Sequence, residues 1–287
     1  MIAIQDSENA HTRTVRSLRI FSNNILTRSI ISLIYKPKRK LPVRVFDIDY
    51  NHPFGLAAGM DKKGEAINGW QSIGLSFTEI GGVTMLEQSG NPKPRMFRSN
   101  KHKALVNRMG FNNPGSDNMQ KSLSKHFDKF GKPDIPVWVN LGKSKLTENN
   151  DAHNDYSTTL ERLWKYSDLF VINVSSPNTP NLRDLQGEEE LRKIISKCME
   201  INNNQAAEHG SKQKPILVKV APDMSLEQLE QIVTVAIDEG CSGIVATNTT
   251  ISRPDEVKGD LKLAETGGMS GKPLRDKSTC LLYTSPS

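Results

Sequence analysis

The feature that most constrains the fold is a regular alternation of short apolar runs with helical stretches from Asn51 onward. The apolar runs predict strands at 54–58, 77–83, 137–141, 169–174, 216–220 and 243–247. Helical spacing predicts helices near 65–73, 114–130, 153–167, 188–201 and 225–239. Because the runs are apolar on both faces and helices separate them, we expect a parallel α/β sheet covered by helices.

Two architectures fit this alternation, a doubly wound sheet and a (β/α)8 TIM barrel. Polar residues follow nearly every predicted strand, at Asp61, Lys62, Asn140, 173–178, Lys219 and 247–249. In a barrel all of these strand ends meet at one face, which is where catalytic residues sit. The glycines of segment 55–59 lack the GxGxxG spacing of a dinucleotide-binding sheet. We therefore favour a barrel of which about six βα units are present, over residues 46–276.

The positive charge of the chain is concentrated near its N-terminus. The formal net charge is +6, yet nine basic residues and no acidic ones lie between His11 and Phe46, namely Arg13, Arg16, Arg19, Arg28, Lys36, Lys38, Arg39, Lys40 and Arg44. Apolar residues recur among them at helical spacing, as at Val15, Leu18 and Phe21. Residues 1–45 therefore predict an amphipathic helix or helix pair at a membrane surface. A helix packed on the protein body and a mitochondrial transit peptide are the alternatives.

Other composition signals exclude several classes of site. The three cysteines form no CxxC pair and predict reduced thiols, and the six histidines show no metal-ligand spacing, so no metal site is expected. Because the basic residues cluster in one terminal segment, no nucleic-acid partner is expected either. No apolar stretch of about 18 residues or more exists that would predict a membrane-spanning helix.

Amide side chains recur at successive strand ends. Segment 173–180 carries Asn173 and Asn178 among hydroxyl residues and prolines, segment 107–112 carries two more asparagines, and further amides are Asn140 and Asn248. Such segments commonly form side-chain-capped turns. Repeated buried amides instead favour a polar heterocyclic ligand, because each amide must find a partner. Lys219 lies within the apolar run 216–220. Because an unpaired buried charge is costly, its position predicts an anionic partner.

Six motifs, in order over roughly residues 10–276, resemble the class 2 dihydroorotate dehydrogenases. They are Gly55-Leu-Ala-Ala-Gly-Met-Asp-Lys62, Asn107-Arg-Met-Gly-Phe-Asn112, Asn173-Val-Ser-Ser-Pro-Asn-Thr179, Leu217-Val-Lys-Val-Ala-Pro-Asp223, Thr247-Asn-Thr-Thr250 and Glu265-Thr-Gly-Gly-Met-Ser-Gly-Lys-Pro-Leu274. The resemblance implies a barrel that uses flavin mononucleotide (FMN) to oxidise dihydroorotate to orotate in pyrimidine synthesis. It also implies transfer of the electrons to a membrane quinone.

The resemblance also assigns expected roles to individual residues. Ser176 looks like the catalytic base, with Thr179 and Phe111 shaping the route of its proton. Expected substrate-binding residues are Lys62, Asn107, Arg108, Met109, Gly110, Phe111, Asn173, Asn178, Asn248 and Thr249. Expected FMN-binding residues are Ala57, Ala58, Gly59, Met60, Asp61, Gly82, Asn140, Asn173, Lys219, Thr247 and Gly271. Lys219 would stabilise the negative charge of reduced flavin.

The resemblance further implies a class and a location. Serine at position 176, where the soluble class 1 enzymes carry cysteine, indicates the quinone-reducing class. We expect a monomer held peripherally on the cytoplasmic side of the bacterial inner membrane, with the mitochondrial inner membrane as the alternative. Other FMN barrels, similar to dihydropyrimidine dehydrogenase or to tRNA-dihydrouridine synthase, are the competing enzymatic interpretations.

The end of the sequence departs from the family pattern. Residues 277–287 do not resemble the family and are interpreted as a foreign read-through tail. Only six of the eight βα units of a complete barrel are predicted, and the loops of the last two units hold the FMN phosphate in barrels of this kind. The polypeptide as printed is therefore expected to be an inactive fragment that binds FMN weakly and exposes two sheet edges.

Overall fold

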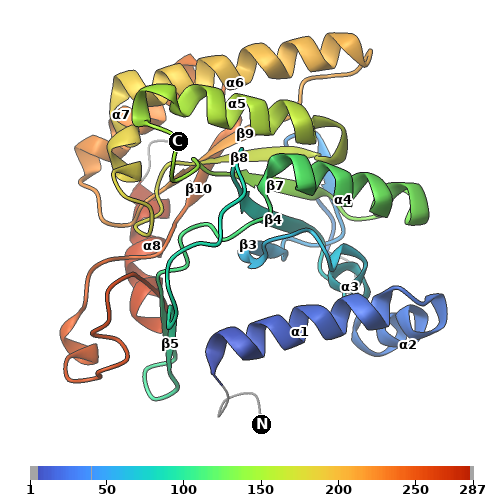
Figure 1. Cartoon of the computed structure of the whole chain (residues 1–287), viewed down its shortest axis with the longest axis horizontal. Coiled ribbons are helices and arrows are strands. Elements are labelled where there is room, and N and C mark those ends of the chain that lie inside the picture. Colours follow the sequence, from blue (N-terminus) through green and yellow to red (C-terminus); the bar gives the residue numbers. More distant parts are fainter. Residues whose placement is uncertain (1–5, 40, 285–287) are drawn as a thin grey trace.

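A computed structural model describes residues 6–39 and 41–284 (Figure 1). At its centre lies one parallel sheet of six strands in the order β10-β9-β8-β7-β4-β3. The strands are β3 (Leu56–Asp61), β4 (Thr78–Val83), β7 (Val137–Leu141), β8 (Leu169–Asn173), β9 (Ile216–Val220) and β10 (Gly243–Ala246). All six predicted strands are present, and the predicted α/β barrel class is confirmed as a six-stranded part of a barrel.

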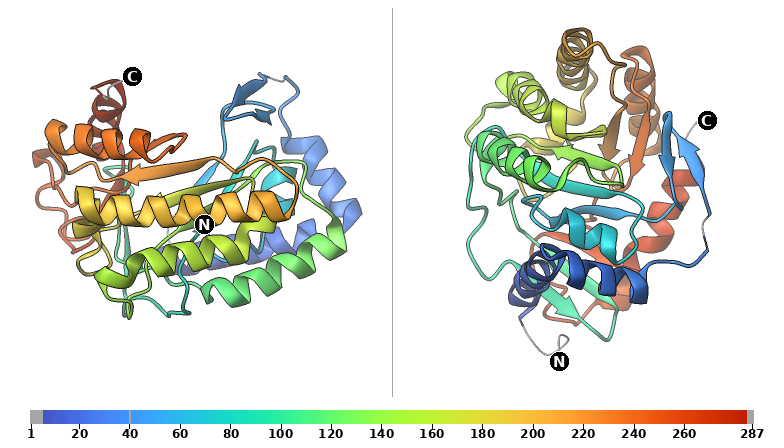
Figure 2. Two further views of the ribbon diagram at one scale, coloured as in Figure 1. Left: turned by 90° about the horizontal axis from the view of Figure 1, so that it is seen from above. Right: turned by 90° about the vertical axis from the view of Figure 1, so that its right-hand side faces the viewer.

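Helices cover one face of this sheet (Figure 2). They are α3 (Ile67–Ser72), α4 (Gly115–Phe130), α5 (Ala152–Leu163), α6 (Glu188–Glu208), α7 (Leu226–Asp238) and α8 (Lys272–Thr284). Short 3-10 turns occupy Asn149–Asp151, Trp164–Tyr166, Leu182–Gln186 and Asp255–Val257. In β8, Phe170 and Ile172 face the helices within the main core, whereas Leu169 and Val171 belong to a separate cluster on the other face. This two-sided burial explains why the strands read as unbroken apolar runs.

A β-hairpin that the sequence did not predict covers part of the second face. It consists of β1 (Val43–Val45) and β2 (Ile48–Tyr50), joined by a turn in which both Phe46 and Asp47 have positive φ. The Phe46 side chain packs in the cluster with Leu169 and Val171. Two-residue hairpin turns usually contain Asn-Gly or Asp-Gly, and this turn contains neither pair, so the sequence carries no signal for it.

A second unpredicted sheet lies beside the strand ends. Its three antiparallel strands are β5 (Met96–Ser99), β6 (Ala104–Asn107) and β11 (Gly268–Gly271), in the order β11-β6-β5. Because β11 lies far from β6 in the sequence, the pairing depends on tertiary contact rather than local pattern. It brings the motif around Gly271 next to the motif that begins at Asn107.

The N-terminal helices have different surroundings. α1 (Ser7–Ser22) packs Val15 on Ala66 and Trp70 at the start of the barrel, whereas α2 (Ile25–Tyr35) has no buried residue. The expected helix pair is therefore present, and its role at a membrane stays a prediction. No helix among residues 6–39 and 41–284 is both long and apolar enough to cross a bilayer.

Helix α8 runs through residue 277, where the predicted foreign tail begins. Its Leu281 is buried in the main core, and its Ser278 hydroxyl lies 3.2 Å from the Thr247 hydroxyl. The assignment of 277–287 as foreign stays a prediction, and residues 285–287 lie outside the described part of the chain.

The Asp61 side chain joins the end of β3 to α3 and should be a major contributor to stability. It is fully buried and accepts hydrogen bonds from Glu65 N (2.9 Å), Ala66 N (3.0 Å) and Trp70 Nε1 (2.9 Å). Asp61→Ala should lower the free energy of unfolding by about 3 kcal/mol, because three buried donors lose their acceptor. Denaturant unfolding followed by tryptophan fluorescence measures this. Lys193→Ala, which breaks an exposed helical ion pair, should cost less than about 0.5 kcal/mol. A loss for Asp61→Ala as small as that of the control would contradict the assignment.

Candidate active site

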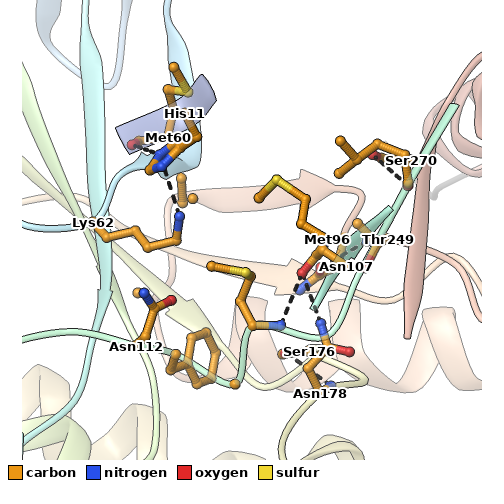
Figure 3. A pocket seen from close by; sticks show the side chains of 18 of the residues that line it. His11, Met60, Lys62, Met96, Asn107, Asn112, Ser176, Asn178, Thr249 and Ser270 are labelled. Carbon is orange, nitrogen blue, oxygen red and sulfur yellow. Dashed lines mark hydrogen bonds between the residues drawn. The ribbon is translucent and has the colours of Figure 1, made fainter. Parts of the chain in front are cut away.

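A cavity of about 530 Å³ lies at the C-terminal ends of the parallel strands (Figure 3). Its lining comes from β3, β4, β8 and β9, from the loops after β6 and β10, from the β5–β6–β11 sheet, and from α1 on the outside. Strand ends meet here because all six strands run in one direction. The cavity is therefore where a barrel of this kind holds its catalytic groups.

Most of the predicted site residues line this cavity. They are Ala58, Gly59, Met60, Lys62, Gly82, Asn107, Met109, Gly110, Phe111, Asn173, Ser176, Asn178, Lys219, Asn248 and Thr249. The motifs quoted from five separate stretches of sequence thus converge on one place. Their individual roles stay predictions.

The other predicted site residues do not line the cavity. These are Ala57, Asp61, Arg108, Asn140, Thr179, Thr247 and Gly271. The Asp61 carboxylate accepts hydrogen bonds from residues at the start of α3. Arg108 forms an ion pair with Glu265 at 2.7 Å, and its guanidinium group lies over the Phe97 ring. Asn140 and Thr179 are buried, and Asn140 accepts a hydrogen bond from the lining residue Asn173.

Polar side chains from β4, β7, β8 and the loop after β10 form a continuous hydrogen-bonded row along the cavity wall. Asn140 Nδ2 donates to Glu79 Oε1 at 2.6 Å, and Asn173 Nδ2 donates to Asn140 Oδ1 at 2.9 Å. Asn248 Nδ2 then donates to Asn173 Oδ1 at 3.1 Å. The second Glu79 oxygen accepts from Ala58 N at 2.9 Å, and Lys219 Nζ lies 4.0 Å from Glu79 Oε1. Amides that would be costly if unpaired therefore satisfy one another.

Ser176 lies in the loop after β8 and is largely buried at the cavity wall. Its Oγ accepts from Asn178 N at 3.3 Å, and Asn178 Nδ2 donates to Asn107 Oδ1 at 3.2 Å. Figure 3 shows these three residues grouped on one side of the cavity. Three buried oxygens nearby have no protein partner, Asn178 Oδ1, Asn112 Oδ1 and Thr179 Oγ1. Buried polar atoms without partners at a cavity wall indicate a polar ligand.

Phe111 and two glycines give the cavity an apolar wall. Phe111 adopts a positive φ of 49°, and its ring lies so close to Gly82 and Gly142 that a Cβ at either position would come within 3 Å of ring carbons. At Gly59, by contrast, φ is +100° and a Cβ would have no neighbour within 4 Å. The backbone of β3 is therefore open at Gly59 to close approach by a flat ring.

Lys62 faces the opposite side of the cavity, beside His11 of α1 (Figure 3). His11 Nε2 lies 2.7 Å from Met60 O and 3.5 Å from Lys62 Nζ. A carbonyl oxygen can only accept, so His11 Nε2 carries the hydrogen that it donates to Met60 O. His11 Nε2 therefore does not accept a hydrogen bond from Lys62 Nζ. Burial, with the Lys62 charge second, lowers the pKa of His11. Burial also lowers the pKa of Lys62 to about 8.

Comparison with known proteins agrees with this geometry. The family model described as dihydroorotate dehydrogenase matches residues 40–285. Dihydroorotate dehydrogenase (quinone) of Chloroflexus aurantiacus is 43% identical over 271 residues, which span 94% of this chain and 74% of that protein. The protein of the same name from Gloeobacter violaceus is 41% identical over 274 residues, spanning 96% and 73%. This chain belongs to the dihydroorotate dehydrogenase family.

A solved structure supports the same relationship. The Eimeria tenella enzyme crystallised with ferulenol superposes with a TM-score of 0.80 at 34% identity, covering 91% of this chain and 76% of that one. The ligand-free form from the same organism gives 0.78 at 35% identity. The family expected from the six motifs is therefore confirmed. The family is an oxidoreductase family that uses flavin in general.

Sequence reasoning missed several residues of this dihydroorotate dehydrogenase site. Glu79 is a charged residue in a buried strand, as is Lys219. Two opposite charges in otherwise apolar strands could have predicted that the two residues lie close together. The cavity is also lined from α1 by Ser7, Ala10, His11 and Thr14, whereas the prediction from the sequence considered only the apolar and basic residues of this segment. Gly81, Met96, Arg98, Leu105, Asn112 and Ser270 complete the lining.

The lowered pKa of Lys62 predicts a pH dependence for anionic ligands. The lysine is cationic below about pH 8 and neutral above it, so a carboxylate ligand loses its partner as the pH rises. The affinity for orotate should fall by up to about tenfold per pH unit above that value. Isothermal titration between about pH 6.5 and about pH 9 measures this. Lys62→Met should bind weakly at every pH with no such slope, whereas Lys63→Met, at an exposed position, should keep it. An unchanged slope in Lys62→Met would assign the titration to another group.

Proposed function

We propose that the cavity is the active site of a quinone-dependent dihydroorotate dehydrogenase, in which FMN takes electrons from dihydroorotate and returns them to a membrane quinone. One observation carries the proposal: Ser176, a set of amides, the buried Lys219 and the partly buried Lys62 converge on one cavity from separate motifs. The names of the relatives support the choice of substrate and acceptor. The reaction would serve pyrimidine synthesis.

The residues of the cavity fit a flavin ring. Gly59 leaves the backbone of β3 open, and the Phe111 ring packs against Gly82, where a Cβ would come within 3 Å of it. Lys219 is buried beside Glu79 and would place its cationic head against the anionic edge of the ring. When bound, FMN accepts the hydride that leaves C6 of dihydroorotate. The described residues would hold the ring through Ala58, Gly59 and Asn173, which line the cavity, and through Asn140, which accepts from Asn173.

The protein residues that face the substrate supply binding and proton transfer. Lys62 would hold the substrate carboxylate, and Asn107, Asn178, Asn248 and Thr249 would pair with the amide edges of the pyrimidine ring. Ser176 Oγ would remove the C5 proton. A serine hydroxyl is a weak base, so it needs an outlet for the proton, and buried Thr179, whose hydroxyl has no protein partner, is the candidate relay.

The N-terminal helices fit a peripheral membrane contact. α2 carries a large set of exposed apolar side chains, namely Ile25, Leu26, Ile30, Leu33, Ile34 and Tyr35. Arg28, Lys36, Lys38 and Arg39 lie among and after them. This combination would seat the helix in the interface of an anionic bilayer. We propose the cytoplasmic face of a bacterial inner membrane as the location and a monomer as the working form.

Removing the Ser176 hydroxyl should block the first half-reaction. Ser176→Ala should slow the bleaching of flavin absorbance by dihydroorotate by roughly 10²–10⁴-fold, because the general base is lost. The flavin content of the purified variant should stay unchanged, since Ser176 is assigned to the substrate. Rapid-mixing absorbance spectroscopy under anaerobic conditions measures the rate. Bleaching at the original rate would exclude Ser176 as the base.

The exposed face of α2 should carry the membrane contact without affecting the flavin site. Replacing Ile30 and Leu33 by Asp should abolish binding to anionic vesicles in a sedimentation assay and reduce turnover with a long-chain quinone. Bleaching of flavin by dihydroorotate should stay unchanged, because α2 does not line the cavity. The matched control replaces Leu146 and Leu261 by Asp, since these are exposed elsewhere at 82% and 86%. Equal vesicle binding by both double variants would mean that α2 makes no membrane contact.

A further inference from the structure

Glu79 occupies an unusual place for a carboxylate in this fold. It lies within β4 with 3% exposure, and no part of the proposed reaction uses it. Its two oxygens accept from Asn140 Nδ2 at 2.6 Å and from Ala58 N at 2.9 Å. Lys219 Nζ, at 4.0 Å, is the nearby cation that offsets the cost of burying its charge.

We infer that Glu79 is a positioning residue that fixes the donor and acceptor pattern of the cavity wall by orienting the amides of Asn140, Asn173 and Asn248. The inference deepens the proposed function, since the wall it orients is the proposed flavin and substrate site. An ionised carboxylate can only accept hydrogen bonds. Asn140 must therefore turn its NH2 group toward Glu79 and its oxygen away.

The same constraint passes along the strand ends. Asn140 Oδ1 points away from Glu79 and accepts from the NH2 group of Asn173, at 2.9 Å. Asn173 Oδ1 is thereby turned toward the NH2 group of Asn248, at 3.1 Å. Asn248 Oδ1 in turn accepts from Thr249 N at 2.8 Å. Two backbone donors, Ser175 N at 3.3 Å from Asn173 Oδ1 and Thr249 N, hold the same orientation from the other end, and Glu79 fixes it at the Asn140 end of a row of amides that could otherwise rotate by half a turn.

The orientation decides what the cavity offers a ligand. One Asn173 N–H is engaged by Asn140, and the other remains as a donor at the wall. Both Asn248 N–H groups are engaged, by Asn173 Oδ1 and Ser175 Oγ, and its carbonyl oxygen accepts from Thr249 N. The remaining Asn173 N–H therefore suits a ring that presents a C=O group at this wall. Reversal of the chain would present the opposite pattern and reject such a ring.

Glu79→Gln tests this inference with almost no change in shape. Glutamine has one acceptor, so either Ala58 N or Asn140 Nδ2 must face a donor, and the fixed orientation is lost. We expect roughly a 10- to 100-fold fall in kcat/KM for dihydroorotate, carried mainly by KM, from an unsatisfied buried group. The flavin midpoint potential should also rise, since a negative charge near the ring is removed.

Asp155→Asn is the matched control, because Asp155 is fully buried and accepts from Met85 N, Ser144 N and Thr147 Oγ1 away from the cavity. It should lower the melting temperature without moving KM or the potential.

A second substitution should restore the pattern. In Glu79→Gln with Asn140→Asp, the glutamine oxygen can accept from Ala58 N while the glutamine NH2 group donates to the new carboxylate, which still accepts from Asn173. The double variant should recover most of the KM and the potential lost in Glu79→Gln. A double variant no better than Glu79→Gln, or a Glu79→Gln variant identical to the control, would overturn the inference.

A structural readout separates this inference from the proposed function. In the protein without added ligands, side-chain amide NMR should show slow hydrogen exchange at Asn140 and Asn173, faster exchange in Glu79→Gln, and slow exchange again in the double variant. Fast exchange of the Asn140 and Asn173 amides in the unmodified protein would contradict the inference that Glu79 holds them in one orientation. Protected amides in a protein that oxidises no dihydroorotate would contradict only the proposed function.

Discussion

Parallel pairing of the six strands is the constraint on which the site depends. Parallel registers, such as Asn140 beside Val171 and Asn173 beside Lys219, bring residues that are far apart in sequence to one level of the sheet. Helices cover one face of each strand, and polar residues such as Asn140, Asn173 and Lys219 alternate with the core residues and lie on the other face. Their side chains are then forced together and must satisfy one another. The row of amides along the cavity wall is the result.

Two buried charges stabilise this arrangement from separate strands of the sheet. Glu79 in β4 and Lys219 in β9 lie 4.0 Å apart although β7 and β8 separate their strands in sheet order. The curvature of the sheet brings them together across its concave side. Either charge alone would be expensive in this setting, and together with Asn140 and Ala58 N they are mutually compensated. A flat sheet with the same strand order could not make this contact, so the ion pair also depends on the barrel-like curvature.

The sequence predicted what is local and missed what is tertiary. All six parallel strands could be found because each is a short apolar run bounded by polar residues, and β7 and β9 were predicted to the residue. The β5–β6–β11 sheet was missed because β11 pairs with a strand far away in the chain, which no local pattern reveals. The β1–β2 hairpin was missed because Phe46 and Asp47 replace the usual glycine-containing turn and are held by packing.

The site shows the same division. Residues such as Ser176 and Asn107 could be proposed from motifs, whereas Glu79 could not, because its partners on β7 and β9 become neighbours only after folding. Helix α1 is a further case. The predicted segment 1–45 treats the N-terminal helices as one unit, yet α1 lines the cavity with His11 and is tied to the barrel by the Glu8–Arg95 ion pair at 2.8 Å. α2 contributes no buried residue. The two helices are therefore placed differently: α1 completes the wall of the cavity beside Lys62, whereas α2 leaves its apolar side chains exposed.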